Sequence, residues 1–188
     1  RAVADTLRGR FSLEKGEVFL NGVKPSLFRN TKKAFVIACG TSWHAALVGK
    51  FLLEELAGLP SEVDLASEFR YRIPTIGRGD LLIPISQSGE TADTLAALRA
   101  GKSRGATILS ICNVIDSSIS RESHHALYTH AGPEIGVAST KAFTSQMAAL
   151  YLLALAIARA KGIMESHGVQ DRLEELVRLP AQLEAVLA

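Results

Sequence analysis

The stretch that decides the fold is Leu81-Leu82-Ile83-Pro84-Ile85-Ser86-Gln87-Ser88-Gly89-Glu90-Thr91, in which an apolar run leads directly into a polar turn. A short, uninterrupted apolar run is typical of a strand buried on both faces of a sheet. The residues that follow have helical spacing, so the turn lies at a helix N-terminus, where free N–H groups and the helix dipole favour an anion. Because the turn contains no Lys or Arg, neutral donors would hold that anion. This arrangement suits a small phosphorylated metabolite that must be released again.

Outward from this stretch, short apolar runs alternate with helical periods from residue 34 onward. The alternation predicts an α/β fold, in which helices cover both faces of a five-stranded parallel sheet. In the first of these helices we place Leu47, Phe51 and Leu56 on the stripe that faces the core. We expect strands at 34–39, 62–65, 80–86, 106–112 and 126–129, and helices at 43–57, 91–104, 117–122 and 139–161.

The predicted sheet occupies a central domain, residues 31–162, with an extension on each side. The N-terminal extension, 1–30, combines a short helical pattern with a strand and turn around residues 18–22. The C-terminal extension, 163–188, repeats leucines interrupted by Pro180 and predicts an amphipathic helix pair or linker. Since the chain starts at Arg1 rather than Met, we expect it to be a piece of a longer protein.

Composition narrows the functional classes. The chain has 188 residues, 47% of them hydrophobic, and a net charge of +2 spread without a basic stripe, which argues against nucleic acid as a partner. Its longest apolar stretch, 147–158, is too short to span a membrane. Cys39 and Cys112 each end an apolar run and lack metal-ligand spacing, so we expect both to be buried and reduced, in a cytoplasmic protein without a metal.

Three polar turns follow strands of the predicted sheet. They are residues 39–42 after the first strand, 86–91 after the third, and 132–140 after the fifth. Ligands of open parallel sheets bind beyond the carboxyl ends of the strands, so the three turns are expected at one edge. Each turn alone is explained as well by helix capping, with Thr41 or Ser42 capping the first helix. Three such turns together favour a binding site.

The common motifs for other chemistries are missing from these turns. No G-x-G-x-x-G follows the first strand, and no G-x-x-x-x-G-K-[ST] occurs anywhere, which disfavours a nucleotide cofactor. Ser88 lacks the flanking glycine of a serine-hydrolase nucleophile elbow. We therefore expect neither a cofactor nor a nucleophilic serine.

Four longer motifs, in this order, resemble the first sugar isomerase (SIS) domain of the glucosamine-6-phosphate synthase family. This family makes glucosamine 6-phosphate and glutamate from fructose 6-phosphate and glutamine. The resemblance covers roughly residues 1–165 and implies a flavodoxin-like, three-layer α/β/α sandwich. The motifs are residues 39–42 (CGTS), 66–72 (ASEFRYR), 86–94 (SQSGETADT) and 134–143 (EIGVASTKAF).

The resemblance also implies which residues bind fructose 6-phosphate or glucosamine 6-phosphate. Ser86, Ser88 and Thr91 would hold the phosphate with help from Gln87, and further contacts would come from Thr41, Ser42, Val137 and Ser139. It implies a homodimer, and in the parent chain a glutaminase domain and a second SIS domain that carries the catalytic groups. We therefore expect this chain to contribute no catalytic residue of its own.

The carboxylates and histidines of the chain have ready structural uses. Glu90 complements a helix dipole and Glu134 shapes the third turn, and His130 is the histidine that we would test for substrate contact. The main hypothesis is thus a domain that binds a sugar phosphate without converting it. Two alternatives remain: a regulatory module that senses sugar phosphates, and a structural dimerisation domain with an empty pocket.

Overall fold

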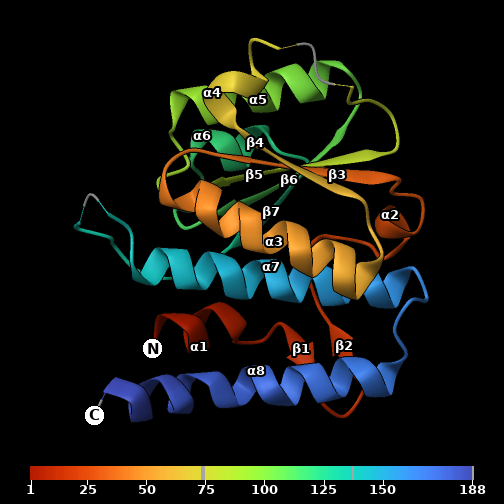
Figure 1. Cartoon of the computed structure of the whole chain (residues 1–188), viewed down its shortest axis with the longest axis vertical. Helices are drawn as coiled ribbons and strands as arrows, with labels where there is room; N and C mark the ends of the chain where they lie inside the picture. Colours follow the sequence, from red (N-terminus) through yellow and green to blue (C-terminus); the bar gives the residue numbers. More distant parts are fainter. Residues whose placement is uncertain (73–74, 137, 188) are drawn as a thin grey trace.

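A computed structural model describes residues 1–72, 75–136 and 138–187 of the chain. Its centre is a five-stranded sheet in which all neighbouring strands run parallel (Figure 1). The second strand of the sheet along the chain lies outside the first, which is the flavodoxin-like order. The predicted α/β class is confirmed, and the ends of the strands shift by one residue at most. In order across the sheet, the strands are β4 (Ser61–Leu65), β3 (Lys33–Ala38), β5 (Asp80–Ser86), β6 (Thr107–Cys112) and β7 (His125–Tyr128).

The central strand β5 is the stretch from which the fold was inferred. Leu81, Leu82 and Ile83 are fully buried, because helices cover both faces of the sheet. Pro84 stands inside this strand although its ring nitrogen carries no N–H for a ladder bond. The register with β6 pairs residues on either side of it, Leu82 with Ile108 and Ile85 with Ile111.

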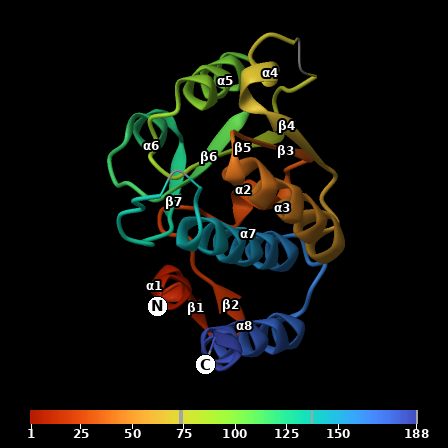
Figure 2. The same ribbon diagram turned by 60° about the vertical axis from the view of Figure 1, so that its left-hand side comes forward.

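Helices form a layer on each face of the sheet (Figures 1 and 2). One layer packs on the sheet through a core that includes Val36, Ile83 and Leu153, and the other through a core that includes Phe35, Leu98 and Ile119. The first layer contains α3 (Thr41–Ala57) and α7 (Lys141–Ala160), with the short α2 (Ser26–Arg29) beside them. The second contains α4 (Ala66–Phe69), α5 (Ala92–Ser103) and α6 (Ser118–Glu122).

The core-facing stripe of α3 differs from the prediction. Phe51 is 60% exposed, and the buried positions are mainly small residues: Ser42, Ala45, Ala46, Gly49, Leu53 and Ala57. At Gly49 a Cβ atom would come within 2.8 Å of the Leu150 side chain on α7. Small residues therefore let α3 pack closely on α7, whereas Phe51 stays exposed and Leu56 is only partly buried against the core.

The two extensions lie together against the outer side of α7 (Figure 2). They comprise α1 (Ala2–Leu7), a hairpin of β1 (Phe11–Ser12) and β2 (Glu17–Val18), and α8 (Ser166–Leu187). Leu7, Leu152 and Leu173 share one core cluster there. The expected helix pair is wrong: α8 continues through Pro180 as a single helix.

Helix α7 is long and apolar enough to cross a membrane by length and composition alone. In this fold 67% of its most apolar window is buried inside the protein. Its apolar residues are thus accounted for by packing between α3 and the extensions.

Candidate functional site

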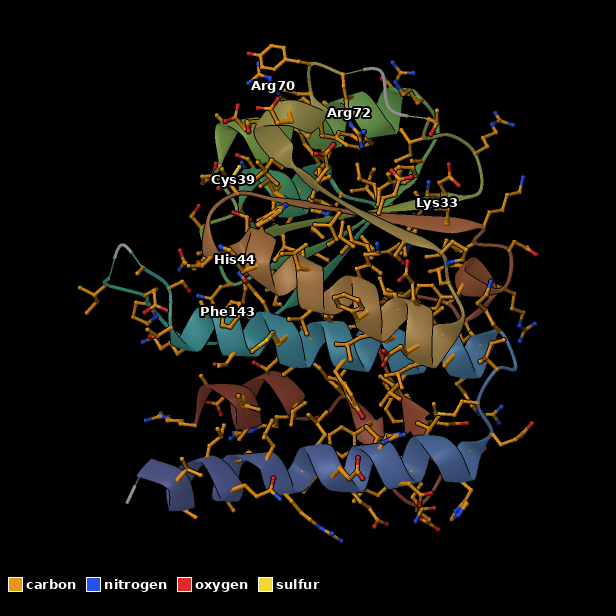
Figure 3. All side chains as sticks on the ribbon, in the orientation of Figure 1. Lys33, Cys39, His44, Arg70, Arg72 and Phe143 are labelled. Atoms are coloured by element: carbon orange, nitrogen blue, oxygen red, sulfur yellow. The ribbon has the colours of Figure 1, made fainter. Side chains whose placement is uncertain are left out.

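A polar pocket lies at the carboxyl ends of β3 and β5, close to the start of α7. Figure 3 marks this edge, because Cys39 follows the end of β3 and Lys33 begins the strand on the opposite side. The pocket has a volume of about 270 Å³, a size that suits a small metabolite. Its lining residues are Cys39, Gly40, Thr41, Ser42, Ile85, Ser86, Gln87, Ser88, Thr91, Glu134, Gly136 and Ser139.

All three predicted polar turns contribute to this pocket. Among the residues proposed from the sequence, Thr41, Ser42, Ser86, Gln87, Ser88, Thr91 and Ser139 line it. Val137 lies outside the described residues. The geometry brings the hydroxyl and amide groups together around one space, while their binding of a sugar phosphate stays a prediction.

Hydrogen bonds within the turn hold its shape before any ligand arrives. Ser86 Oγ accepts a bond of 3.0 Å from the Gly89 N–H and lies 3.0 Å from Thr91 Oγ1. Ser88 Oγ accepts a bond of 3.2 Å from the Glu90 N–H. The bond between Ser86 and Thr91 uses the hydrogen of one of these two hydroxyls. The hydrogen of the other, and that of Ser88, remain available to an acceptor in the pocket.

Helix capping does not account for the hydroxyl groups. The N-cap of α3 is Gly40, so the expected capping by Thr41 or Ser42 is wrong; both residues belong to the first turn of the helix. Thr91 is the N-cap residue of α5, but its side chain makes no capping bond. The Ser42 hydroxyl instead accepts a bond of 3.0 Å from Gln146 Nε2 on α7.

Two helix N-termini converge on the pocket, that of α3 at Thr41 and that of α5 at Ala92. The first N–H groups of a helix have no partner within the helix, and the helix dipole places partial positive charge there. No Lys or Arg is among the described residues that line the pocket. An anion would therefore be held by backbone N–H groups, hydroxyls and the Gln87 amide.

The third turn contributes the carboxylate of Glu134, which was expected to shape the turn but not to line the pocket. Glu134 Oε2 accepts bonds from the Ala142 N–H at 3.1 Å, the Thr140 N–H at 3.3 Å and the Ser139 hydroxyl at 3.4 Å. This carboxylate thus complements the N-terminus of α7 and shapes the turn, as expected. The available signal was an acidic residue five positions before the start of the predicted helix at 139–161.

The side chain of Asn113, just after β6, fixes the loop that leads to this turn. Its Oδ1 accepts bonds from the Ala131 N–H at 2.7 Å and the Thr129 hydroxyl at 3.0 Å, and its Nδ2 donates to the Gly132 carbonyl at 2.8 Å. Asn113 also lines a second pocket, of about 550 Å³, with Gln87 and Glu134. Because Gln87 and Glu134 line both, the two pockets adjoin.

Glu90 does not line the pocket but ties its turn to α6. Its Oε1 accepts a bond of 2.7 Å from the Ser118 N–H at the start of that helix. This backbone hydrogen bond, with one from the Ser118 hydroxyl and the charge of Arg121, holds the pKa of Glu90 below its usual value. The carboxylate is thus ionised and used structurally.

The two cysteines have different environments. Cys112 is fully buried, and burial raises its pKa to about 11. Cys39 is half-buried and lines the pocket, so the expectation that both thiols are buried is wrong for Cys39. Its place at the edge of the sheet, one residue beyond β3, accounts for the difference.

Other candidate groups lie away from the pocket. Within the described residues no group of three or more His, Cys, Asp or Glu side chains is arranged to hold a metal ion. His44 is exposed on α3 (Figure 3). His130 lines the adjoining second pocket rather than the first.

The family model for the SIS domain matches residues 27–156. Glutamine–fructose-6-phosphate aminotransferases (isomerizing) from Chlorobaculum tepidum and Bacteroides thetaiotaomicron are 50% and 51% identical over 97% and 98% of this chain. The chain spans 30% of the length of each of these relatives.

Two solved structures have a fold similar to that of this chain. The C-terminal domain of glucosamine-fructose-6-phosphate aminotransferase from Francisella tularensis superposes with a TM-score of 0.89 at 43% identity, over 96% of this chain and 50% of that one. Glucosamine-6-phosphate deaminase from Thermotoga maritima has a TM-score of 0.62 at 22% identity, over 84% of this chain and 47% of that one, and shows a shared fold only.

Proposed function

The chain belongs to the SIS domain family, and from this premise we propose that its polar pocket binds the phosphate end of a hexose 6-phosphate. The observation that carries the proposal is the pocket at the carboxyl edge of the sheet, where three polar turns and two helix N-termini face one space. Neutral donors in this number suit a dianionic phosphate that must enter and leave during each catalytic cycle.

We propose fructose 6-phosphate and glucosamine 6-phosphate as the ligands, since the matched relatives are named for aminotransfer to fructose 6-phosphate. Ser86, Ser88 and Thr91 would hold the phosphate, with the Gln87 amide beside them. The sugar would extend past Ser139 into the adjoining pocket, which offers about 550 Å³ of further space. Thr41 and Ser42 would close the phosphate end from the α3 side.

We further propose that this chain binds the sugar phosphate while another part of the protein moves the proton that isomerisation requires. A general base must reach the proton on the sugar carbon. Glu134 is the one carboxylate among the described residues that line the first pocket, and it already accepts three hydrogen bonds at the N-terminus of α7. The chain would act as the first SIS domain of a glutamine–fructose-6-phosphate aminotransferase, joined to a glutaminase domain and a second SIS domain.

Isothermal titration calorimetry with fructose 6-phosphate and glucosamine 6-phosphate tests the proposal. We expect saturable binding of at least one of them and none of fructose, which lacks the phosphate. Ser88→Ala removes a donor to a charged acceptor and should weaken binding about tenfold or more, since such hydrogen bonds contribute roughly 1.5–3 kcal/mol.

Ser103→Ala is the matched control, because Ser103 lies at the far end of α5 and its hydroxyl bonds only to the Ala100 carbonyl. It should leave the affinity unchanged. Absence of heat with both sugar phosphates at millimolar concentration would overturn the proposal. A homodimeric state and a cytoplasmic location stay predictions, and sedimentation velocity tests the first.

A further inference from the structure

A separate pocket lies along β7, which is an edge strand of the sheet, where that strand faces the N-terminal extension. It has a volume of about 440 Å³ and shares no lining residue with the first pocket. Three of the chain's five histidines line it, together with an arginine and an asparagine. Its lining residues are Arg10, Asn21, Gly22, His124, His125, Ala126, Leu127, Tyr128 and His130.

Arg10 is a buried cation that has no counter-ion among the residues described by the structure. It is only 9% exposed, and its Nη2 donates a hydrogen bond to the Tyr128 carbonyl at the end of β7. Its Nη1 is shielded from solvent and has no hydrogen-bond partner. No carboxylate of the described residues lies within ion-pair distance of Arg10. A buried charge of this kind is costly unless an opposite charge compensates it.

The rest of the pocket is also suited to an anion. The described lining contains no Asp or Glu, whereas the imidazole groups and the Asn21 amide are hydrogen-bond donors. His130 adopts a left-handed backbone conformation, with φ at 52°, which is uncommon for a non-glycine residue. Its ring lies beside that of Tyr128, with 6.2 Å between the ring centroids. Residues held in such conformations cluster at binding sites.

We propose that this pocket, built by Arg10, Asn21, His125 and His130, is a second binding site, which takes a small oxyanion such as a phosphate or carboxylate group. The bound anion supplies the counter-charge that no described residue offers to Arg10. Among the described residues the site shares no lining residue with the first pocket, but His130 also lines the adjoining pocket into which the sugar would extend. His125 lines only the second site of these three pockets, so its signal distinguishes anion binding here from binding in the sugar-phosphate pocket. The second site would remain if the first pocket bound no sugar phosphate.

Nuclear magnetic resonance of the histidine side chains tests this site directly. The imidazole signals of His125 and His130 are followed while sodium phosphate is added to the chain at constant ionic strength, with sodium acetate in a parallel titration. We expect saturable shifts of both signals with phosphate. Shifts with phosphate alone assign the site to phosphate groups, and shifts with acetate as well assign it to oxyanions in general.

Arg10→Gln should weaken the phosphate response about tenfold or more, because it removes the uncompensated charge. Arg8→Gln changes the net charge equally but removes an exposed side chain paired with Asp5, so it should have no effect. Should Arg10→Gln fail to fold, Asn21→Ala, in an exposed turn, should weaken the response at least about twofold. The proposal would be overturned if the unmodified chain and the Arg10→Gln variant responded equally to phosphate. It would also be overturned if neither the His125 nor the His130 signal shifted saturably.

Discussion

Gly89 is the residue on which the shape of the polar turn depends most. Its φ is +68°, and a Cβ atom there would lie 2.0 Å from Ser117 Oγ. We expect Gly89→Ala to destabilise the protein by about 1–2 kcal/mol through its backbone conformation, and by about 1–3 kcal/mol more through overlap with Ser117. Because the turn must shift, its affinity for a hexose 6-phosphate should fall as well. Thermal unfolding and calorimetry measure the two effects.

Gly162→Ala separates strain from overlap. Gly162 has a φ of +70° and nothing within 4 Å of an added Cβ atom. The Gly162→Ala variant should therefore lose only the backbone contribution to the free energy of unfolding, about 1–2 kcal/mol. Its affinity for the hexose 6-phosphate should stay unchanged. Equal losses of stability in the two variants would contradict the account of Gly89.

The imidazole of His124 links stability to pH. Its Nδ1 accepts a bond of 2.9 Å from the Ile108 N–H, and this bond requires an unprotonated Nδ1. Burial lowers the pKa of His124 below its ordinary value of 6.5, with the charges of Lys102 and His125 acting in the same direction. The unfolded chain therefore binds the proton more readily, and the stabilisation is present above about pH 6.5 and lost as the pH falls through the lowered pKa.

His124→Leu leaves the Ile108 N–H without its side-chain partner. It should destabilise the protein by about 1–3 kcal/mol near neutral pH, and the difference should shrink towards about pH 5. Urea unfolding at a series of pH values measures it. A difference that stays constant across the series would show that protonation of His124 plays no part.

The hydroxyl residues of the site could be predicted from the sequence, since Ser86, Ser88 and Thr91 follow an apolar run that is typical of a buried strand. Glu134 and Cys39 lie in turns that were predicted at the same edge, but neither could be recognised as a pocket-lining residue in the same way. Glu134 enters it because its carboxylate bonds to N–H groups of residues 140 and 142, a contact set by the turn's conformation. Cys39 lines it because β3 ends one residue earlier.

The contact between α3 and α7 is the element-scale feature that orients the Thr41 turn. Gly49 of α3 faces Leu150 of α7, and an added Cβ atom would approach its Cδ1 to 2.8 Å. We expect Gly49→Ala to destabilise the protein by about 1–3 kcal/mol, even though alanine favours helix formation by about 1 kcal/mol over glycine. Chemical denaturation measures the change.

A double-mutant cycle gives the control for this contact. In a Leu150→Ala background the space is open, so adding Gly49→Ala should stabilise that variant through helix propensity. If Gly49→Ala has the same effect in both backgrounds, the helices do not meet at this pair.

The strands could be predicted almost to the residue: β3, β5 and β6 are largely apolar runs bounded by turns, and β4 alternates polar and apolar residues. The stripe of α3 could not, because Leu47, Phe51 and Leu56 also have helical spacing. Most positions of α3 are apolar or small, so periodicity alone does not tell which stripe is buried. Close packing against α7 selects the small residues, and it leaves Phe51 exposed.

At the scale of the whole molecule, α8 joins the fold through contacts with segments far away in the sequence. Leu173 is fully buried in a cluster with Val3, Leu7 and Leu152. Leu173→Ala should cost about 2–5 kcal/mol and preserve a single unfolding transition. Val186→Ala, at a position 84% exposed, should change stability by no more than about 0.5 kcal/mol. A separate early transition in the Leu173 variant would show that α8 unfolds independently.

The docking of the extensions could not be read from the sequence. Leucine spacing predicts an amphipathic helix but not the surface that it covers, and Pro180 argued for a break. The N-terminal extension supplies that surface together with α7. Helix α8 lies on the outer side of α7, on the far side of that helix from the sheet (Figure 1). None of its described residues lines the pocket at the carboxyl ends of β3 and β5.

The central claim is that the polar turn at residues 86–91 holds the phosphate of a hexose 6-phosphate through neutral donors. The most direct test is a crystal structure of the chain with fructose 6-phosphate bound. We expect a phosphate group within about 3 Å of the Ser88 and Thr91 hydroxyl oxygens, facing the N-terminus of α5. A sugar phosphate bound elsewhere, with the pocket of Ser86 to Thr91 holding only solvent, would contradict it.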